Sequence, residues 1–358
     1  MTSSAPIPSS SSPSWDPQCN ASSAGFSDTL PPDFPGGAGR YAPSPSGDLH
    51  LGNLRTAILA WAMARRGENP FYLRVENLDR VRPGAAERQL KDLAALGLDW
   101  DASPGAENLP TFKDAMERPV PGVLYQSTRL VAYEHAVNSL RDAGLIYECY
   151  CTRREIQEAS SAPHGAPGAY PGTCRNLDKS QRAERRTRRP PAMRLRAQVT
   201  EYTVRDDFYG SYTGTVDDFV LVRNDGTYAY NLTSVVDDAF VGVEQIVRGD
   251  DLLPSAPRQA YLAYLLGLKE PRYAHVPLVL NGEGKRLAKR DGAVTLPQLR
   301  TAGVSIPQVL GWIAASIPII DPLGRPHEAS VPVSDATTIL EGFDPAYMSR
   351  EPWVVRTL

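Results

Sequence analysis

The sequence predicts an α/β fold built around a parallel β-sheet. Apolar residues recur at helical spacing over 54–66, and the next apolar run, Phe71–Val75, is typical of a buried strand. A second helical pattern follows at 84–96. A loop, helix, strand and helix in this order, within about 60 residues, indicate parallel strands joined by right-handed crossovers. Such sheets bind ligands at the carboxyl ends of their strands.

The other elements follow from the same kinds of pattern. A glycine closes each predicted helix of the first half: 54–66 ends at Gly67, 84–96 at Gly97 and 129–143 at Gly144. The segment 146–151 alternates like a strand, and the Pro-, Gly- and Arg-rich segment after it, to about residue 189, is predicted to be an inserted ribbon.

The second half continues with strand-like segments and a turn at Asn224–Gly226. In order, its segments are strand-like 193–212 and 216–222, apolar 232–240 and 243–248, helical 256–266, a short strand at 276–280 and a helix at 306–315.

Composition indicates an ordinary globular protein. The 358 residues carry a net charge of −3, and 42% of them are hydrophobic. No apolar run reaches the roughly 18 residues of a membrane span, and the N-terminus lacks the pattern of an export signal. We therefore expect a cytoplasmic protein with no membrane contact, and a monomer. Residues 1–35 are rich in Ser, Pro, Gly and Ala and are predicted to be disordered.

The segment Arg40–Asn53 is the best candidate for a ligand-binding loop. It combines prolines, serines, glycines and a histidine directly before a predicted helix. Unpaired N–H groups and the helix dipole at such a position favour an anion. Neither a Gly-x-Gly-x-x-Gly nor a Walker fingerprint is present. Taken alone, His50 is more often a structural residue, and the late basic segment 284–290 is more often a solvated loop.

The cysteines suggest a metal. Cys149 and Cys151 lie on one face of a predicted strand, and Cys174 follows a Pro/Gly-rich loop, whereas Cys19 lies in the N-terminal segment and is expected to be an idle thiol. Zinc usually takes four ligands, so one is missing. His164 and Tyr170 are the candidates, and histidine is the commoner ligand in general. The alternative is a pair of buried core thiols.

An arginine-rich run lies within 175–196. It could contact nucleic-acid phosphates, or it could be a solvated charged loop.

Several motifs occur together in a fixed order. They are Arg-x-Ala-Pro-Ser-Pro-Ser-Gly-x-Leu-His-Leu-Gly-Asn at 40–53, Leu-Arg-Val-Glu-Asn-Leu-Asp at 73–79, Val-Val-Asp-Asp at 235–238, Val-Arg-Gly-Asp-Asp-Leu at 247–252 and Lys-Arg-Leu-Ala-Lys-Arg at 285–290. From about residue 38 to 295, this set resembles the class I aminoacyl-tRNA synthetases of the glutamyl type. The resemblance implies a Rossmann-like catalytic domain and an enzyme that forms an aminoacyl adenylate.

By this resemblance, His50, Gly52 and Asn53 hold ATP from one side. The lysine loop Arg286–Arg290, with Lys289 as its second lysine, holds it from the other, and Mg²⁺ shares the phosphate charge. The chain departs from the family pattern at three positions. Asn53 replaces a histidine, Arg286 replaces a lysine, and Ala288 replaces a serine, which removes a hydroxyl hydrogen bond to the nucleotide.

The resemblance also implies an L-glutamate pocket. Its residues are Arg40, Ala42 through its backbone, Ser44, Glu76, Tyr230 and Arg248. Their chemistry agrees, because glutamate needs an acid for its ammonium and at least one bidentate cation for its carboxylates. Which arginine takes which carboxylate stays open.

Nearby acidic residues have other interpretations. The alternative for the pocket is an ordinary ion-pair cluster of Arg74, Glu76 and Asp79. Asn77 stands where the family pattern suggests an aspartate. Asp237 and Asp238 are interpreted as structural or tRNA-positioning residues, because adenylate formation needs no protein nucleophile.

The zinc motif points to one branch of the family. Cys-x-Cys followed by Tyr-x-x-x-Cys resembles the zinc ribbon of that branch, in which the tyrosine completes the site. This implies a structural Zn²⁺ on Cys149, Cys151, Tyr170 and Cys174, with His164 as the fallback. The expected division is a catalytic domain at 36–145 and 193–295, a zinc-ribbon insertion at 146–192 and a short helical part at 296–358.

The expected function follows from this plan. The tail 343–353 of this chain resembles the ending of proteins in a branch that has no anticodon-binding domain. The resemblance implies the activity of that branch, which attaches glutamate to the queuosine base at the wobble position of tRNA(Asp). The first alternative is a minimal synthetase that charges the 3′ end of tRNA(Glu). The second is a non-catalytic tRNA-binding paralogue.

Overall fold

The computed structural model describes residues 37–106, 122–160, 169–287, 294–317, 319, 328 and 331–355. The predicted disorder of 1–35 therefore lies outside the described residues, as do the expected roles of Cys19, His164 and Lys289.

A seven-stranded sheet forms the centre of the molecule, in the order β3-β2-β1-β9-β10-β6-β7. Its strands are β1 (Ala38–Tyr41), β2 (Phe71–Val75), β3 (Leu124–Tyr125), β6 (Glu201–Asp206), β7 (Gly210–Thr215), β9 (Val243–Gly249) and β10 (Arg272–Val276). All neighbours are parallel except β6 and β7. Strand β1 has β2 on one side and β9 on the other. The strand order therefore changes direction at β1, which makes it a switch point of the topology.

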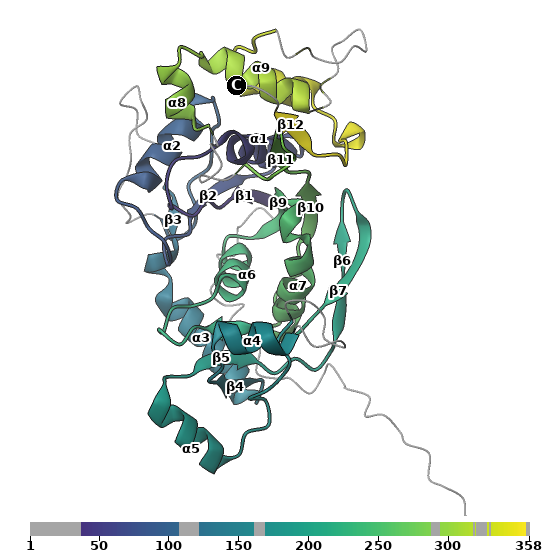
Figure 1. The fold of residues 1–358 in the computed structure, drawn as a ribbon. Helices are drawn as coiled ribbons and strands as arrows, with labels where there is room; N and C mark the ends of the chain where they lie inside the picture. The colour runs from purple at the N-terminus through teal and green to yellow at the C-terminus, as the bar shows by residue number, and fades with distance from the viewer. Residues whose placement is uncertain are drawn as a thin grey trace, which may run out of the picture.

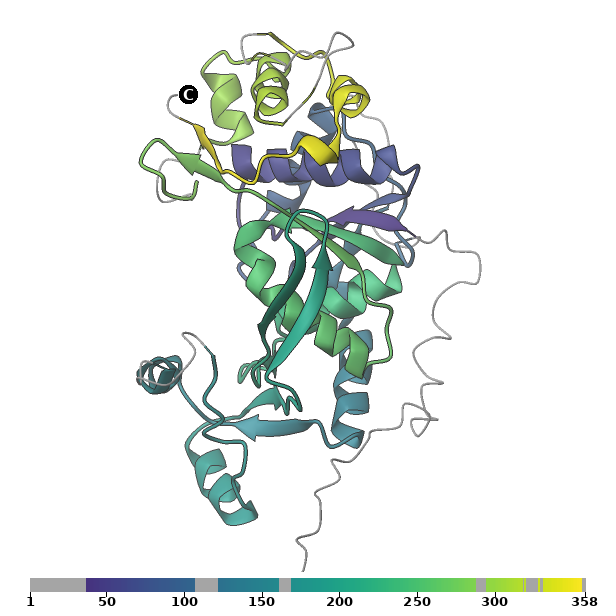
Figure 2. The same cartoon turned by 90° about the vertical axis from the view of Figure 1, so that its right-hand side faces the viewer.

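Helices cover both faces of this sheet (Figures 1 and 2). They are α1 (Leu51–Arg66) and α2 (Ala85–Ala95) on one face and α6 (Tyr230–Phe240) and α7 (Ala256–Leu265) on the other. The alternation of β2 matches this: Phe71, Leu73 and Val75 join the core of α1, whereas Tyr72 packs with residues of α7. The predicted α/β fold with a parallel sheet is confirmed.

The predicted helices of the first half are confirmed with small shifts in their bounds. Helix α1 ends before Gly67, α2 before Leu96 and Gly97, and α3 (Leu130–Asp142) before Ala143 and Gly144. Gly97 and Gly144 have φ values of +83° and +71°, a conformation that only glycine adopts at low cost.

The insertion contains more than a ribbon. Strands β4 (Ile146–Cys149), β5 (Ala192–Leu195) and β8 (Val220–Val222) form an antiparallel sheet. Helices α4 (Arg153–Ser160) and α5 (Lys179–Arg188) lie between β4 and β5. The arginine-rich run is therefore helical and not a loop, because Asp178 and Gln181 form a capping box before a series of good helix formers. Figure 1 places this part at the opposite end of the molecule from α8 and α9.

Two other segments correct the sequence-based expectations, and a third, the apolar segment 232–240, had no element assigned to it. The strand-like run 193–212 contains β5, β6 and the start of β7, with Gly210 turning between β6 and β7. The segment 232–240 forms helix α6. The expected strand 276–280 is divided into β10 and β11 (Val279–Asn281), because Pro277 between them has no N–H to continue a ladder.

The C-terminal part packs onto α1. It contains α8 (Leu296–Thr301), α9 (Ile306–Ser316), α10 (Ala336–Gly342) and β12 (Trp353–Val355). The helix expected at 306–315 is thus confirmed, whereas α8, α10 and β12 were not expected. Strand β12 pairs with β11, and the buried Phe343 joins the core around α1. Among the described helices, none is long and apolar enough to cross a membrane.

Candidate active site

A cavity of about 910 Å³ opens at the carboxyl ends of β1, β2 and β9. This is the edge at which a parallel sheet binds its ligands. The cavity brings together every predicted glutamate and ATP residue that the structure describes. They are Arg40, Ala42, Ser44, His50, Gly52, Asn53, Glu76, Tyr230 and Arg248.

The start of α1 forms one wall. Nδ1 of His50 accepts a hydrogen bond from the backbone N–H of Asn53, and Oδ1 of Asn53 accepts one from the backbone N–H of His50, both at 3.3 Å. The two residues thus form a reciprocal cap. The first turn of α1 has no acidic residue, so the positive end of the helix is not neutralised from within. An anion would be stabilised here.

Both ends of the lysine loop lie beside this wall. Arg286 and Leu287, its first two residues, line the cavity. After it, the carbonyl of Val294 accepts a hydrogen bond from Leu51 N at 3.3 Å, and Thr295 forms a β-bridge with His50.

A buried ion-pair network forms the floor. Arg40 Nε lies 3.2 Å from Asp238 Oδ1, and Arg74 binds the same carboxylate. Arg74 also lies 3.2 Å from Glu76. Burial alone would raise the pKa of Asp238, but Arg40 and Arg74 outweigh it and hold that pKa below its usual value. The charge of Arg40 is therefore largely matched within the protein.

The sequence alternative was that Arg74, Glu76 and Asp79 form one ordinary ion-pair cluster. The structure confirms it for the first two residues only. Arg74 and Glu76 are paired, whereas Asp79 pairs with Arg223 at 3.0 Å. Glu76 also lines the cavity, and burial raises its pKa. Asn77 bonds Ser127 through both ends of its amide and does not line the cavity.

Asp237 is fully buried next to this network. It accepts hydrogen bonds from Gln126, Arg129 and Tyr133, at 3.1, 3.2 and 2.7 Å. These contacts join α6 to α3 and to the segment just before it, which agrees with the structural interpretation of this aspartate.

Arg248 differs from Arg40 in its partners. Its side chain donates to Gln259 Oε1 at 2.6 Å, to His275 Nε2 at 2.9 Å, and over longer distances to Tyr230 Oη and the Leu252 carbonyl. All of these acceptors are neutral. Within the described ranges, no carboxylate lies within ion-pair distance of Arg248, which is only 6% exposed. Its positive charge is therefore left for a ligand to match.

Sequence reasoning missed several supporting residues. Gln89 donates to the carbonyls of Ser44 and Gly47, at 3.1 and 2.6 Å, and so fixes the ligand-binding loop. Asp251 pairs with Arg286, the residue that begins the lysine loop. The only sequence signal for the role of Gln89 is its place in the middle of an amphipathic helix. That place does not reveal a hydrogen-bond partner 45 positions away.

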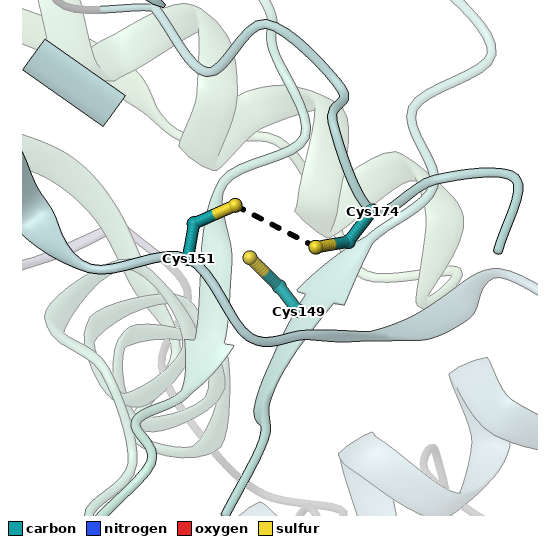
Figure 3. A group of neighbouring side chains, drawn as sticks. All are labelled: Cys149, Cys151 and Cys174. Carbon is teal, nitrogen blue, oxygen red and sulfur yellow. Dashed lines mark hydrogen bonds between the residues drawn. The ribbon is translucent and has the colours of Figure 1, made fainter. Parts of the chain in front are cut away.

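The predicted metal ligands converge in the insertion. Figure 3 shows the thiols of Cys149, Cys151 and Cys174 pointing toward one another, all within 4.8 Å. Tyr170 Oη lies 3.3 Å from Cys149 Sγ and 3.5 Å from Cys151 Sγ. The guanidinium of Arg194 lies over the Tyr170 ring, 3.6 Å from its centroid. The three thiols are soft ligands of the type that zinc prefers, and the phenol oxygen brings the number of candidate ligands to the four of a tetrahedral site.

Comparisons with known proteins agree with this geometry. Residues 38–310 match the family model described as tRNA synthetases class I (E and Q), catalytic domain. The chain is 58% identical over 321 residues to a protein of Nocardia farcinica named glutamyl-Q tRNA(Asp) synthetase, covering 89% of this chain and 93% of that protein. A Cutibacterium acnes protein of the same name is 47% identical over 296 residues, 81% of this chain and 78% of that one.

A solved structure shows the same fold. The glutamate–tRNA synthetase of Elizabethkingia anophelis superposes with a TM-score of 0.72 at 23% identity, over 90% of this chain and 68% of that one. The resemblance seen in the motifs is thereby confirmed. The chain belongs to the class I tRNA synthetases of the E and Q type and carries their catalytic domain.

Proposed function

We propose that the protein activates L-glutamate with ATP and transfers it to the queuosine base at the wobble position of tRNA(Asp). The shared name of the relatives, and a match over 93% of the first of them, support this target. The observation that carries glutamate as the substrate is the buried Arg248, which lines the cavity with no carboxylate partner among the described residues.

Glutamate binds between Arg248 and Glu76 in this proposal. Arg248 takes a carboxylate of the substrate as a bidentate donor, and Glu76 accepts from its ammonium. Ser44 and Tyr230 donate hydrogen bonds, and Ala42 contributes its backbone. Arg40 shapes the floor through Asp238 and adds to the positive field of the site.

ATP lies along the start of α1. His50, Gly52, Asn53 and Lys289 hold its phosphates, and Mg²⁺ bound with the nucleotide shares their charge. A carboxylate oxygen of glutamate then attacks the α-phosphorus, and pyrophosphate leaves. The protein contributes by orienting the two reactants and by stabilising the charge that develops on the phosphate.

Transfer is the second step. A hydroxyl of the queuosine cyclopentene ring attacks the carbonyl carbon of the adenylate. The new ester bond forms as AMP leaves with the electrons of the broken C–O bond. This step needs an anticodon loop, and not a 3′ end, at the mouth of the cavity.

The insertion holds a structural zinc in this proposal. Cys149, Cys151, Cys174 and Tyr170 would bind the ion, which would crosslink β4 to the segment before α5. The short distances among these four side chains support this ligand set.

Transfer of labelled glutamate tests the function. The enzyme, ATP and labelled glutamate are incubated with tRNA(Asp) that carries or lacks queuosine, and the label is mapped after nuclease digestion. We expect label in the anticodon loop of the queuosine-containing tRNA only. Label on the terminal adenosine would favour a minimal tRNA(Glu)-charging enzyme. Absence of glutamate-dependent ATP–pyrophosphate exchange in folded protein would favour the non-catalytic paralogue.

A further inference from the structure

A chain of buried side chains runs across three neighbouring strands, from the end of β6 to Arg248. Asp206 ends β6, His275 lies in β10, and Arg248 lies in β9 between β10 and β1. Asp206 Oδ2 lies 2.6 Å from His275 Nδ1, and Arg248 Nε lies 2.9 Å from His275 Nε2. His275 is fully buried, and Asp206 is 2% exposed.

The hydrogen bonds determine where the imidazole carries its proton. A guanidinium can only donate, so Nε2 of His275 must be the acceptor of the Arg248 N–H. The proton of the neutral ring is then on Nδ1, where it is donated to Asp206. Burial lowers the pKa of His275, and this too favours the neutral ring. Asp206 is well suited to fix this tautomer, because its carboxylate also accepts from the backbone N–H groups of Phe208, Tyr209 and His275.

The arrangement orients the Arg248 side chain without neutralising its positive charge. A carboxylate in direct contact with Arg248 would hold it in place but would also match its charge, as Asp238 does for Arg40. A neutral imidazole between Asp206 and Arg248 holds the guanidinium through a hydrogen bond and leaves its charge for the substrate.

We propose that His275, held by Asp206, is a positioning residue that aims Arg248 at a carboxylate of glutamate while keeping that arginine without an internal counter-ion. The inference rests on the proposed function and deepens it. Neither His275 nor Asp206 lines the cavity, so both act through Arg248.

A pair of substitutions at His275 separates positioning from packing. An asparagine places its polar atoms near the position of Nδ1, and a glutamine places them near Nε2. His275→Asn can therefore still bond Asp206 but not Arg248, whereas His275→Gln keeps an acceptor for Arg248. Loss of a hydrogen bond to a charged group predicts that His275→Asn raises the KM for glutamate about ten- to a hundredfold in ATP–pyrophosphate exchange.

The other kinetic constants complete the expectation. The KM for ATP should stay unchanged, kcat should change less than the glutamate KM, and His275→Gln should restore the glutamate KM to within about threefold of the wild type. Asp206→Asn is the second variant: its amide has only one acceptor atom for four donors, so the glutamate KM should again rise. Val276→Ala, a neighbouring core change in β10, is the matched control; it should lower the Tm but not alter this KM.

Two results would overturn the inference. One is an unchanged glutamate KM in His275→Asn, and the other is an equal effect of the asparagine and the glutamine. A wild-type enzyme without glutamate-dependent exchange would give a distinguishable failure, because it would refute the proposed function itself.

Discussion

Arg40 and Asp238 are 198 positions apart in the sequence, yet their side chains form a buried ion pair with Nε 3.2 Å from Oδ1. The same carboxylate binds Arg74, so one aspartate of α6 holds cations from β1 and β2. The floor of the cavity therefore depends on the charge of Asp238.

Asp238→Asn should destabilise the protein strongly. The substitution leaves two buried guanidinium groups without their shared carboxylate, and such a loss typically costs about 3–5 kcal/mol of unfolding free energy. Urea unfolding at pH 7 measures it. Glu244→Gln is the matched control, because its exposed pair with Lys269 should contribute less than about 1 kcal/mol. Equal effects of the two substitutions would contradict the prediction.

The same pair predicts an acid-dependent loss of stability. The pKa of Asp238 is lowered in the folded protein from an ordinary value of 3.8, so the unfolded chain takes up its proton first as the pH falls. The stabilisation is complete above this value and is lost as the pH falls through the folded pKa. The difference between the wild type and Asp238→Asn should thus be constant near neutrality and should shrink below about pH 4.

Asp92 predicts the opposite pH dependence. This aspartate of α2 is 7% exposed, its Oδ2 has no hydrogen-bond partner in the described structure, and burial, with Asp48 nearby, raises its pKa to about 7. Between its ordinary pKa of 3.8 and about 7, the folded state binds the extra proton, so stability falls as the pH rises. Asp92→Asn should therefore be more stable than the wild type at pH 8, and this gain should disappear toward pH 4.

Thermal unfolding of both proteins from pH 4 to 8 measures this difference. Asp142→Asn, at an exposed position of α3, is the control and should change stability by less than about 0.5 kcal/mol at every pH. A difference for Asp92→Asn that is independent of pH would exclude a titrating Asp92 as its cause.

The proposed metal ligands can be tested by measuring the zinc content of variants. Cys149→Ser removes one of three converging thiols and should reduce the bound zinc and lower the Tm, because structural zinc contributes directly to folding. Tyr170→Phe removes the proposed fourth ligand atom and should weaken zinc retention against a chelator. Cys19→Ser is the matched control and should leave one zinc per chain. Unchanged stoichiometry and chelator resistance in both site variants would refute the ligand set.

Local patterns made much of this fold predictable. Strand β2 has the predicted bounds, Phe71–Val75, because an apolar run bounded by turn residues is visible in the sequence. The residues that the motifs predict to bind glutamate and ATP also line one cavity, as far as the structure describes them. The two helices of the insertion were missed, since composition rich in Pro, Gly and Arg hid the capping box of α5.

Contacts between residues far apart in the sequence could not be predicted, for a different reason. A single sequence shows periodicity but not partners, so the contact of Arg40 with Asp238 and that of His275 with Asp206 could not be predicted. The roles of the two arginines stayed open at the sequence level for this reason. Only the partners distinguish Arg40, which has a carboxylate, from Arg248, which has neutral acceptors.

His50 has two possible tasks, and substitutions can separate them. Its Nδ1 caps α1, and the proposed function also gives the ring a contact with ATP. His50→Ala should remove both, with a loss of about 1 kcal/mol of stability and about 10²-fold in the exchange rate. His50→Asn should restore the cap, because asparagine is among the best residues at this position, but not the rate. Thermal unfolding and kcat for exchange measure the two effects. If His50→Asn regained both stability and rate, the histidine would be a structural cap only, and the phosphate contact would have to be assigned to other residues of the loop.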